Sequence, residues 1–135
     1  MMLTRRQMIT GSIGFIAVTQ MPDEAEAARW RVLGSRTVSL GIDRDMIRVS
    51  PYAARFDKIK IRADLNDIEL FDLAVVYGNG QRDDIRVRRI IRRRTETGNL
   101  DLRGDGRYIR RIEMIYRKNP RKGLFALVTV FGRFA

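Results

Sequence analysis

The stretch IELFDLAVVYGNG, residues 68–80, decides the fold. Residues 68–77 are almost continuously apolar, a pattern typical of a central β-strand that is covered on both faces. Gly78, Asn79 and Gly80 follow, and these residue types accept the positive φ angles that tight hairpin turns require. Residues 68–77 are therefore predicted to pair antiparallel with the next β-rich run, residues 85–94.

The alternation of apolar residues slips within the second strand of this hairpin. Ile85 and Val87 occupy odd positions, whereas Ile90 occupies an even one. An extra residue in one strand shifts the alternation in this way. The sequence therefore predicts a β-bulge near Arg88 and Arg89.

The rest of the chain continues the same alternation, interrupted by Gly, Asn, Asp and Pro. The pattern predicts strands at residues 30–40, 46–49, 59–65, 99–102, 108–116 and 124–134, with a turn at residues 41–45. No amphipathic helix is predicted. About eight strands of this kind favour an all-β, antiparallel sandwich or jelly roll, and a closed barrel of roughly five to eight strands is the alternative.

The first 27 residues are predicted to be a signal peptide, which leaves residues 28–135 as a single domain. The uncharged run at residues 8–18 is too short to span a bilayer, which needs about 20 apolar residues. Ala25 and Ala27 fit the small-x-small pattern of a cleavage site before Ala28. We therefore expect a periplasmic or secreted protein without a transmembrane span.

Arg5 and Arg6 indicate the export route. Together with Thr4 and the apolar residues after Gln7 they resemble a twin-arginine signal, although Thr10 stands where a Lys is usual. An ordinary secretory signal also begins with positive charge, so general secretion is the alternative. The remaining alternative is a cytoplasmic protein with an apolar N-terminus.

The composition excludes several kinds of site. The 135 residues contain no His and no Cys, which removes His- and Cys-dependent catalysis, thiolate and imidazole metal sites, and disulfides. The close carboxylate pairs, Asp43 with Asp45 and Asp83 with Asp84, offer too few oxygens for calcium. We expect them to cap turns or pair with arginine, Arg36 being a candidate partner for the first pair. We predict no catalytic residue, no metal, no cofactor and no enzymatic activity.

Several blocks of the chain resemble a known family. They are GSRTVSLGIDRDMIRV (residues 34–49), RFDKI (55–59), VVYGNG (75–80), LDLRG (100–104) and RYIRRI (107–112) with Tyr116. Over residues 30–132 the chain resembles a bacterial family of small exported proteins that is described only as a domain of unknown function. The resemblance implies export and an all-β sandwich, and it carries no catalytic residue. The run at residues 92–95, before Gly98, departs from the family's Gly-containing turn.

The main chemical feature is a dense set of arginines. The net charge is +11, and 23 of the 27 basic residues are Arg. Guanidinium groups bind phosphate, sulfate and carboxylate through paired hydrogen bonds. The candidate anion-binding residues are Arg86, Arg88, Arg89, Arg92, Arg93, Arg94, Arg110 and Arg111.

These arginines leave several functions open. One is a non-enzymatic exported protein that binds an anionic envelope polymer or lipid surface, or assembles with another envelope protein. The arginines also fit a solvated strand face that prevents aggregation. A carboxylate-dependent glycan hydrolase is a second function, and a cytoplasmic nucleic-acid-binding β-barrel is a third if the N-terminus is not a signal. Nucleic acid is disfavoured, because aromatic side chains do not alternate with the basic ones.

Overall fold

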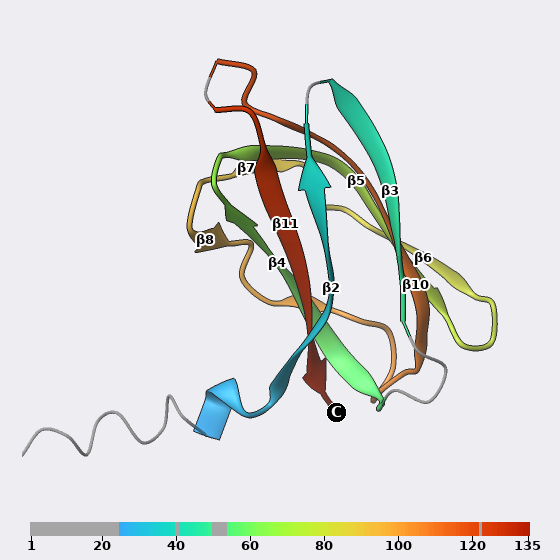
Figure 1. Ribbon diagram of the computed structural model, residues 1–135. Coiled ribbons are helices and arrows are strands. Elements are labelled where there is room, and N and C mark those ends of the chain that lie inside the picture. The colour runs from blue at the N-terminus through green and yellow to red at the C-terminus, as the bar shows by residue number, and fades with distance from the viewer. Residues whose placement is uncertain (1–24, 40, 50–53, 122) are drawn as a thin grey trace, which may run out of the picture. The chain divides into compact units, whose positions relative to one another are not determined.

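The computed structural model describes residues 25–39, 41–49, 54–121 and 123–135 (Figure 1). Arg5 and Arg6 of the predicted export signal lie outside the described residues. Ala25 and Ala27 lie in a helical turn at residues 25–27, which Ala28 follows. Within the described ranges, no helix has the length and apolar character needed to cross a bilayer. Export stays a prediction.

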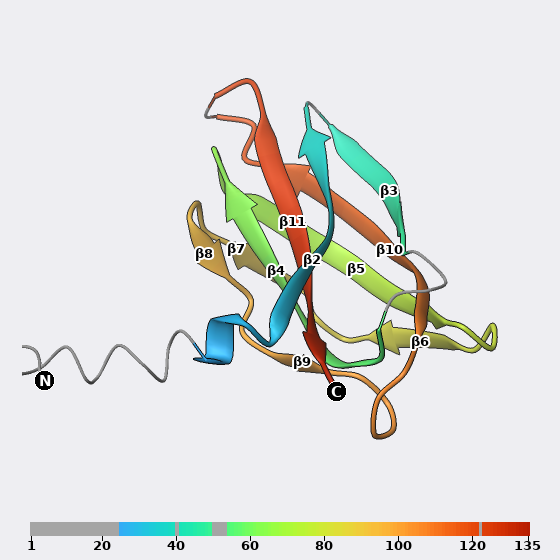
Figure 2. The ribbon, with the colours of Figure 1, turned by 60° about the horizontal axis from the view of Figure 1, so that its bottom comes forward.

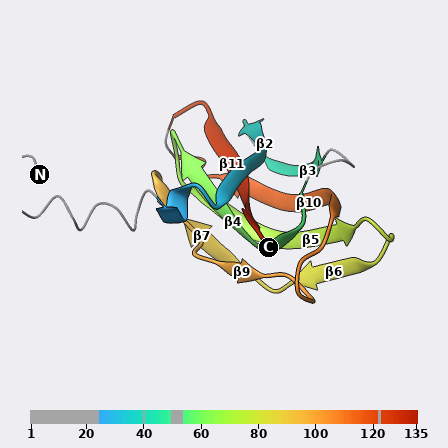
Figure 3. The same ribbon diagram turned by 90° about the horizontal axis from the view of Figure 1, so that it is seen from below.

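The described residues form ten strands. They are β2 (Trp30–Val38), β3 (Ile42–Arg48), β4 (Phe56–Asp64), β5 (Ile68–Tyr77), β6 (Arg82–Ile85), β7 (Arg89–Ile91), β8 (Thr95–Glu96), β9 (Leu100–Asp101), β10 (Ile109–Lys118) and β11 (Ala126–Phe134). One sheet has the order β3-β10-β5-β6, with β7 also paired to β5. The other has the order β2-β11-β4-β8, with β9 also paired to β4. Figure 3 shows the two layers, with β4 and β11 on the left and β10 and β5 on the right. The predicted antiparallel sandwich is confirmed, and the strands that the structure describes do not close into a barrel.

The predicted hairpin is present at the centre of the first sheet. β5 pairs antiparallel with β6, with Leu73 opposite Ile85 and Val76 opposite Arg82. Gly80 lies in the turn with φ at 89°, a conformation that glycine adopts without steric cost. The turn residues therefore direct the chain back along β5, as their types predict.

The single strand predicted at residues 85–94 is wrong. β6 begins earlier and ends at Ile85, β7 begins at Arg89, and residues 86–88 lie outside the ladder. β7 nevertheless pairs with β5, with Ile91 opposite Ile68. Val87 is buried, so the chain leaves the sheet at the point where this side chain enters the core. The interruption is thus wider than the predicted one-residue bulge.

The turn predicted at residues 41–45 is also wrong. β3 begins at Ile42 and pairs with β10, where Ile42 lies opposite Arg117. Asp45 on β3 accepts a hydrogen bond of 2.5 Å from the hydroxyl of Tyr116 on β10. Because the neighbouring strand supplies this partner, a residue type that favours turns is accommodated within a strand.

The core lies between the two sheets and consists of alternate residues of the long strands. Fully or almost fully buried side chains include Phe56, Ile59, Ile61, Ile112, Met114, Val128 and Val130. Gly34 on β2 lets the two sheets approach at one edge, because an added Cβ atom would lie 2.5 Å from Cγ2 of Ile47. The residues between these core positions point outward and form the two outer faces of the sandwich.

Candidate functional site

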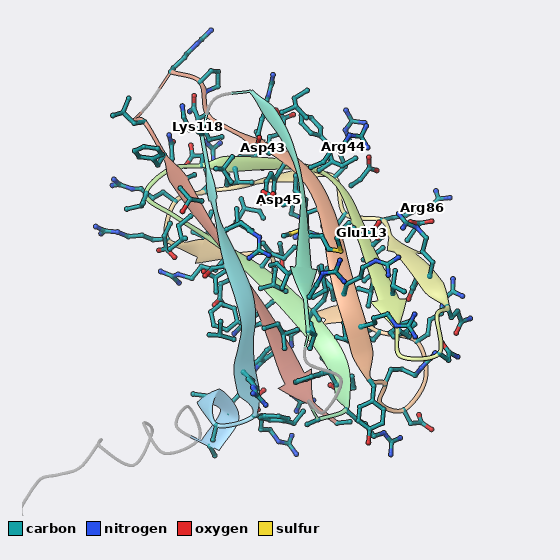
Figure 4. All side chains as sticks on the ribbon, turned by 45° about the vertical axis from the view of Figure 1, so that its right-hand side comes forward. Asp43, Arg44, Asp45, Arg86, Glu113 and Lys118 are labelled. Atoms are coloured by element: carbon teal, nitrogen blue, oxygen red, sulfur yellow. The ribbon has the colours of Figure 1, made fainter. Side chains whose placement is uncertain are left out.

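A groove of about 900 Å³ lies on the outer face of the sheet β3-β10-β5-β6. Its lining begins on β3, crosses β10 and β5, and ends on β6 and residues 86–88. Figure 4 shows Arg44, Glu113 and Arg86 on this side of the molecule, at the right of the view. Figure 2 shows the same sheet from below, with β6 at its lower right edge.

The strand register explains why these residues share one surface. Residues directly opposite one another form a row across four strands: Met46, Glu113, Ala74 and Asp84. The neighbouring outward row contains Arg44, Ile115 and Asp72. Because side chains alternate between the faces of a strand, both rows point away from the core. The groove thus combines charged side chains with apolar ones.

Glu113, in the middle of the groove, is held by two arginines. Nε of Arg111 donates to one of its carboxylate oxygens at 2.7 Å, and Nη1 of Arg82 donates to the other at 2.6 Å. Arg82 also donates to Asp84 at 3.1 Å. The hydrogen bonds from Arg111 and then Arg82 hold the pKa of Glu113 below its usual value. The charges of these two arginines are therefore met by carboxylates of the protein.

Arg44 and Arg86 differ from these paired arginines. Both side chains are exposed, and within the described part of the chain neither forms an ion pair or a hydrogen bond. The carboxylate of Asp72 likewise has no partner among the residues that the structure describes. The groove therefore offers free cations at both sides and a free hydrogen-bond acceptor between them.

The aromatic residue of the groove is already covered by cations. The guanidinium of Arg88 lies 5.4 Å from the ring centroid of Phe71, and that of Arg117 lies 5.7 Å from it. Such cation–π contacts occupy the ring. Arg117 is also paired with Glu69, at 2.8 Å.

Five of the eight predicted anion-binding arginines come from the sheet that carries the groove or from its β6–β7 connection, and Arg89 on β7 is one of them. Arg86 and Arg88 line the groove. Arg111 contacts it through Glu113. Arg110 donates instead to a backbone carbonyl of the β5–β6 turn, at 2.8 Å.

Arg89 and the three arginines of the β7–β8 connection do not line the groove. Arg89 donates to a backbone carbonyl that follows β8, at 2.7 Å. Arg92 lies 3.7 Å from the carboxylate of Asp67. Arg93 and Arg94 are exposed in the turn between β7 and β8. The predicted set is therefore divided between two separate surfaces.

The sequence prediction missed Arg44 as a groove residue. The assignment of residues 41–45 to a turn hid the outward alternation of Ile42, Arg44, Met46 and Arg48 on β3. This alternation of exposed residues was the sequence signal that could have placed Arg44 on the outer face of a strand. Phe71 carried no such signal, because its position depends on an irregularity in the β5–β10 register.

Two buried tyrosines tie strands together through aspartates. The hydroxyl of Tyr116 donates to Asp45, and that of Tyr77 donates to Asp83 at 2.9 Å. Asp83 also pairs with Arg103, at 3.2 Å. Burial raises the pKa of both tyrosines, and the hydrogen bonds to the aspartates raise it further. Both hydroxyls are therefore protonated donors at neutral pH.

The expected ion pair of Arg36 with Asp43 or Asp45 is wrong. Arg36 donates to the backbone carbonyl of Met46 at 2.6 Å and so links β2 to β3. Asp84 forms the expected kind of ion pair, with Arg82. Within the described residues, no group of three or more acidic side chains is placed to hold a metal ion.

The family model described as "Domain of unknown function (DUF2541)" matches residues 11–132. Among solved structures, Pseudomonas aeruginosa AlgX is similar to 78% of this chain, with a TM-score of 0.44 and 16% sequence identity. The chain spans 27% of the length of that AlgX chain. The comparison with curated proteins finds no match. Since the family model covers nearly the whole chain, this protein belongs to the family of the domain of unknown function DUF2541.

Proposed function

We propose that this chain is an exported, non-enzymatic protein of the cell envelope whose groove binds an anionic polymer. The observation that carries the proposal is the pair of free guanidinium groups, Arg44 and Arg86, at the two sides of the groove. Guanidinium groups bind sulfate, phosphate and carboxylate through two parallel hydrogen bonds. Arg82 and Arg111, in contrast, already donate to the carboxylate of Glu113.

The spacing of the two free cations favours a polymer over a single small anion. Arg44 lies on β3 and Arg86 follows β6, with β10 and β5 between them. Three strand spacings of about 4.8 Å separate the two sides of the groove by roughly 14 Å. A chain with repeated charges can contact both sides at once, whereas a single small ion would require both side chains to bend over the floor of the groove.

The floor between the cations favours a saccharide polymer. Asp72 has a free carboxylate that can accept hydrogen bonds from hydroxyl groups, and it would repel a densely phosphorylated chain. Met46 and Ile115 add apolar surface, which suits the C–H faces of sugar rings. A sulfated or uronic polysaccharide therefore fits the groove better than a polyphosphate.

The same features disfavour the alternative functions. Single-stranded nucleic acid binds by stacking bases on aromatic rings, and the ring of Phe71 is occupied by Arg88 and Arg117. Glycan hydrolysis requires one carboxylic acid that keeps its proton, and the lowered pKa of Glu113 keeps that group ionised. Both observations support a binding protein.

The groove proposal is tested with dextran sulfate, with neutral dextran as the control polymer. We expect Arg44→Gln combined with Arg86→Gln to weaken dextran sulfate binding at least tenfold, because each charge-assisted contact is worth roughly 1.5 kcal/mol or more. The matched control is Arg93→Gln combined with Arg121→Gln, which removes the same charge outside the groove. Equal weakening by both pairs, in titrations at about 0.15 M salt, would show non-specific attraction and contradict the proposal.

Export is tested separately, by fractionation of bacterial cells and mass spectrometry of the product. We expect mature protein that begins at Ala28 in the periplasm, and its loss when Arg5→Lys and Arg6→Lys are combined. Periplasmic product from both versions would indicate general secretion. An uncleaved chain in the cytoplasm would contradict an envelope location.

A further inference from the structure

Three loops meet at one end of the sandwich and are tied together by Asp67. They are the β4–β5 turn, the β7–β8 turn and the β10–β11 connection, which lie together at the upper left of Figures 1 and 2. The backbone carbonyl of Asp67 accepts a hydrogen bond from Asn119 at 3.0 Å. Its carboxylate accepts one from the backbone N–H of Arg93 at 2.8 Å. These bonds hold the three loops as one surface.

Large apolar side chains project from this end. Leu124 is 76% exposed, Leu65 is 64% exposed and Phe125 is 51% exposed. Leu127 on β11 lies opposite Asp64 on β4, so the residues just before β11 lie beside those just after β4. Polar residues are the usual occupants of such turns, and a cluster of exposed apolar residues marks an interaction surface.

Arginines whose side chains have no partner among the described residues lie in two of these three loops. Arg93 and Arg94 belong to the β7–β8 turn, where the N–H of Arg94 donates to the carbonyl of Ala63 at 2.7 Å. Arg121 lies in the β10–β11 connection. All three side chains are exposed, and none has an ion pair or hydrogen bond within the ranges that the structure describes.

The carboxylates near this end are already engaged. Asp64 pairs with Arg62 at 2.9 Å, and Asp67 holds the loops together as described above. The surface therefore combines exposed apolar side chains with free positive charge. We call it the loop tip, and it consists of Leu65, Leu124, Phe125, Arg93, Arg94 and Arg121.

We propose that the loop tip docks onto the surface of an anionic lipid bilayer. Leu124, Phe125 and Leu65 would enter the headgroup region, while the arginines bind lipid phosphates. This is the arrangement that interfacial membrane binding requires, namely apolar side chains that insert beside cations that contact anionic headgroups. The proposal is independent of the groove, which these residues do not line.

A lipid surface fits the loop tip better than a protein or a polysaccharide does. Stable protein interfaces bury roughly 1,200–2,000 Å² in total, and three side chains on two loops provide a small fraction of that. A polysaccharide would contact the arginines, but it would cover little of the apolar side chains, because these project from loops and do not form the floor of a groove as Met46 and Ile115 do. A bilayer accepts both components, because its headgroups are anionic and its acyl region is apolar.

The test is co-sedimentation of the full chain with vesicles, at about 0.15 M salt. One set contains equal amounts of phosphatidylglycerol and phosphatidylcholine, and the other contains phosphatidylcholine alone. We expect binding to the anionic vesicles only. The uncharged run at residues 8–18 is present in every variant, so its contribution cancels in comparisons between variants.

Two double variants separate the apolar and basic parts of the loop tip. Leu124→Ser combined with Phe125→Ser is expected to weaken vesicle binding about tenfold or more, because inserted apolar area is lost. Arg93→Gln combined with Arg121→Gln is expected to weaken it about 30-fold, since each cation near an anionic surface contributes roughly 1 kcal/mol. All four side chains are exposed, which favours retention of the fold in both variants.

The groove pair, Arg44→Gln combined with Arg86→Gln, is the control with matched charge. We expect it to change vesicle binding less than about threefold, because the charges lie outside the loop tip and are screened at this salt concentration. The loop-tip variants are expected to retain dextran sulfate binding. A wild-type chain that binds only dextran sulfate, or only anionic vesicles, therefore shows which of the two proposals has failed.

Insertion is measured directly with Phe125→Trp. Its emission, after subtraction of the wild-type spectrum that contains Trp30, is expected to shift to the blue with anionic vesicles only. The proposal would be overturned if the Leu124→Ser, Phe125→Ser variant bound vesicles as tightly as the wild type and the emission of Phe125→Trp did not shift. That result would show adsorption by charge alone. Equal weakening by the groove pair and the loop-tip arginine pair would also overturn the proposal.

Discussion

The two outer faces of the sandwich both carry rows of cations, but they neutralise those cations differently. On β4 each outward cation has an acidic partner: Lys58 with Asp101 at 2.6 Å, Lys60 with Glu96 at 3.3 Å, and Arg62 with Asp64 at 2.9 Å. On the opposite sheet Arg44 and Arg86 have no such partner within the described residues. The β4 face is therefore internally neutralised, whereas the groove retains charge for a ligand.

The difference arises from the strands that flank each row. β8 and β9 each place an acidic residue beside β4, with Glu96 opposite Arg62 and Asp101 opposite Lys58. Across the groove, the carboxylates of Glu113 and Asp84 are both bound by Arg82. Charge density along one strand therefore does not identify a binding surface. The acids supplied by neighbouring strands decide which cations remain free.

The comparison can be sharpened by Glu113→Gln, which releases Arg111 into the groove and leaves Arg82 paired with Asp84. We expect dextran sulfate to bind about tenfold more tightly, because the released guanidinium of Arg111 can form a charge-assisted contact worth roughly 1.5 kcal/mol. The matched control is Glu96→Gln, which removes the Lys60–Glu96 ion pair on the outer face of β4. No β4 residue lines the groove, so the affinity for dextran sulfate should change less than about threefold. Titration of both variants against dextran sulfate measures the two effects.

Equal gains from both substitutions would contradict this comparison of the faces. Such a result would mean that total charge, and not the position of the free cations, controls binding. Thermal unfolding of both variants serves as the control for a disturbed fold. Each removes one surface ion-pair partner, so we expect only small changes in stability.

Much of the fold follows from the sequence, because in most strands the local pattern of apolar and turn-forming residues agrees with the tertiary packing. Residues 68–80 predict β5 and its hairpin turn, and the structure has both. β10 and β11 are also close to the predicted ranges, since their apolar alternation matches the pleat. Errors occur where a distant residue decides the outcome. Asp45 fits a strand only because Tyr116, far along the chain, donates a hydrogen bond to it.

The site was less predictable than the fold for the same reason. The run at residues 86–94 predicts a single basic surface, but the break after Ile85 and the turn before Thr95 send its arginines to different surfaces. Arg44 reaches the groove through pairing of β3 with β10, a long-range contact that alternation alone does not specify. The apolar residues Leu65 and Leu124 are adjacent at the loop tip only through the β4–β11 register.

The smallest expected effect is the pH dependence of the ion pairs that Glu113 forms in the groove. The folded pKa of Glu113 lies below its usual value of 4.5, so its ion pairs stabilise the fold above that pH. Their contribution is lost as the pH falls through the lowered folded value. We expect wild type to exceed Glu113→Gln in unfolding free energy by about 0.5–1 kcal/mol at neutral pH, a small margin because these groups are partly exposed and screened. Urea unfolding in strongly acidic buffer should remove this margin, and the same margin in both buffers would show that Glu113 contributes through packing and not through charge.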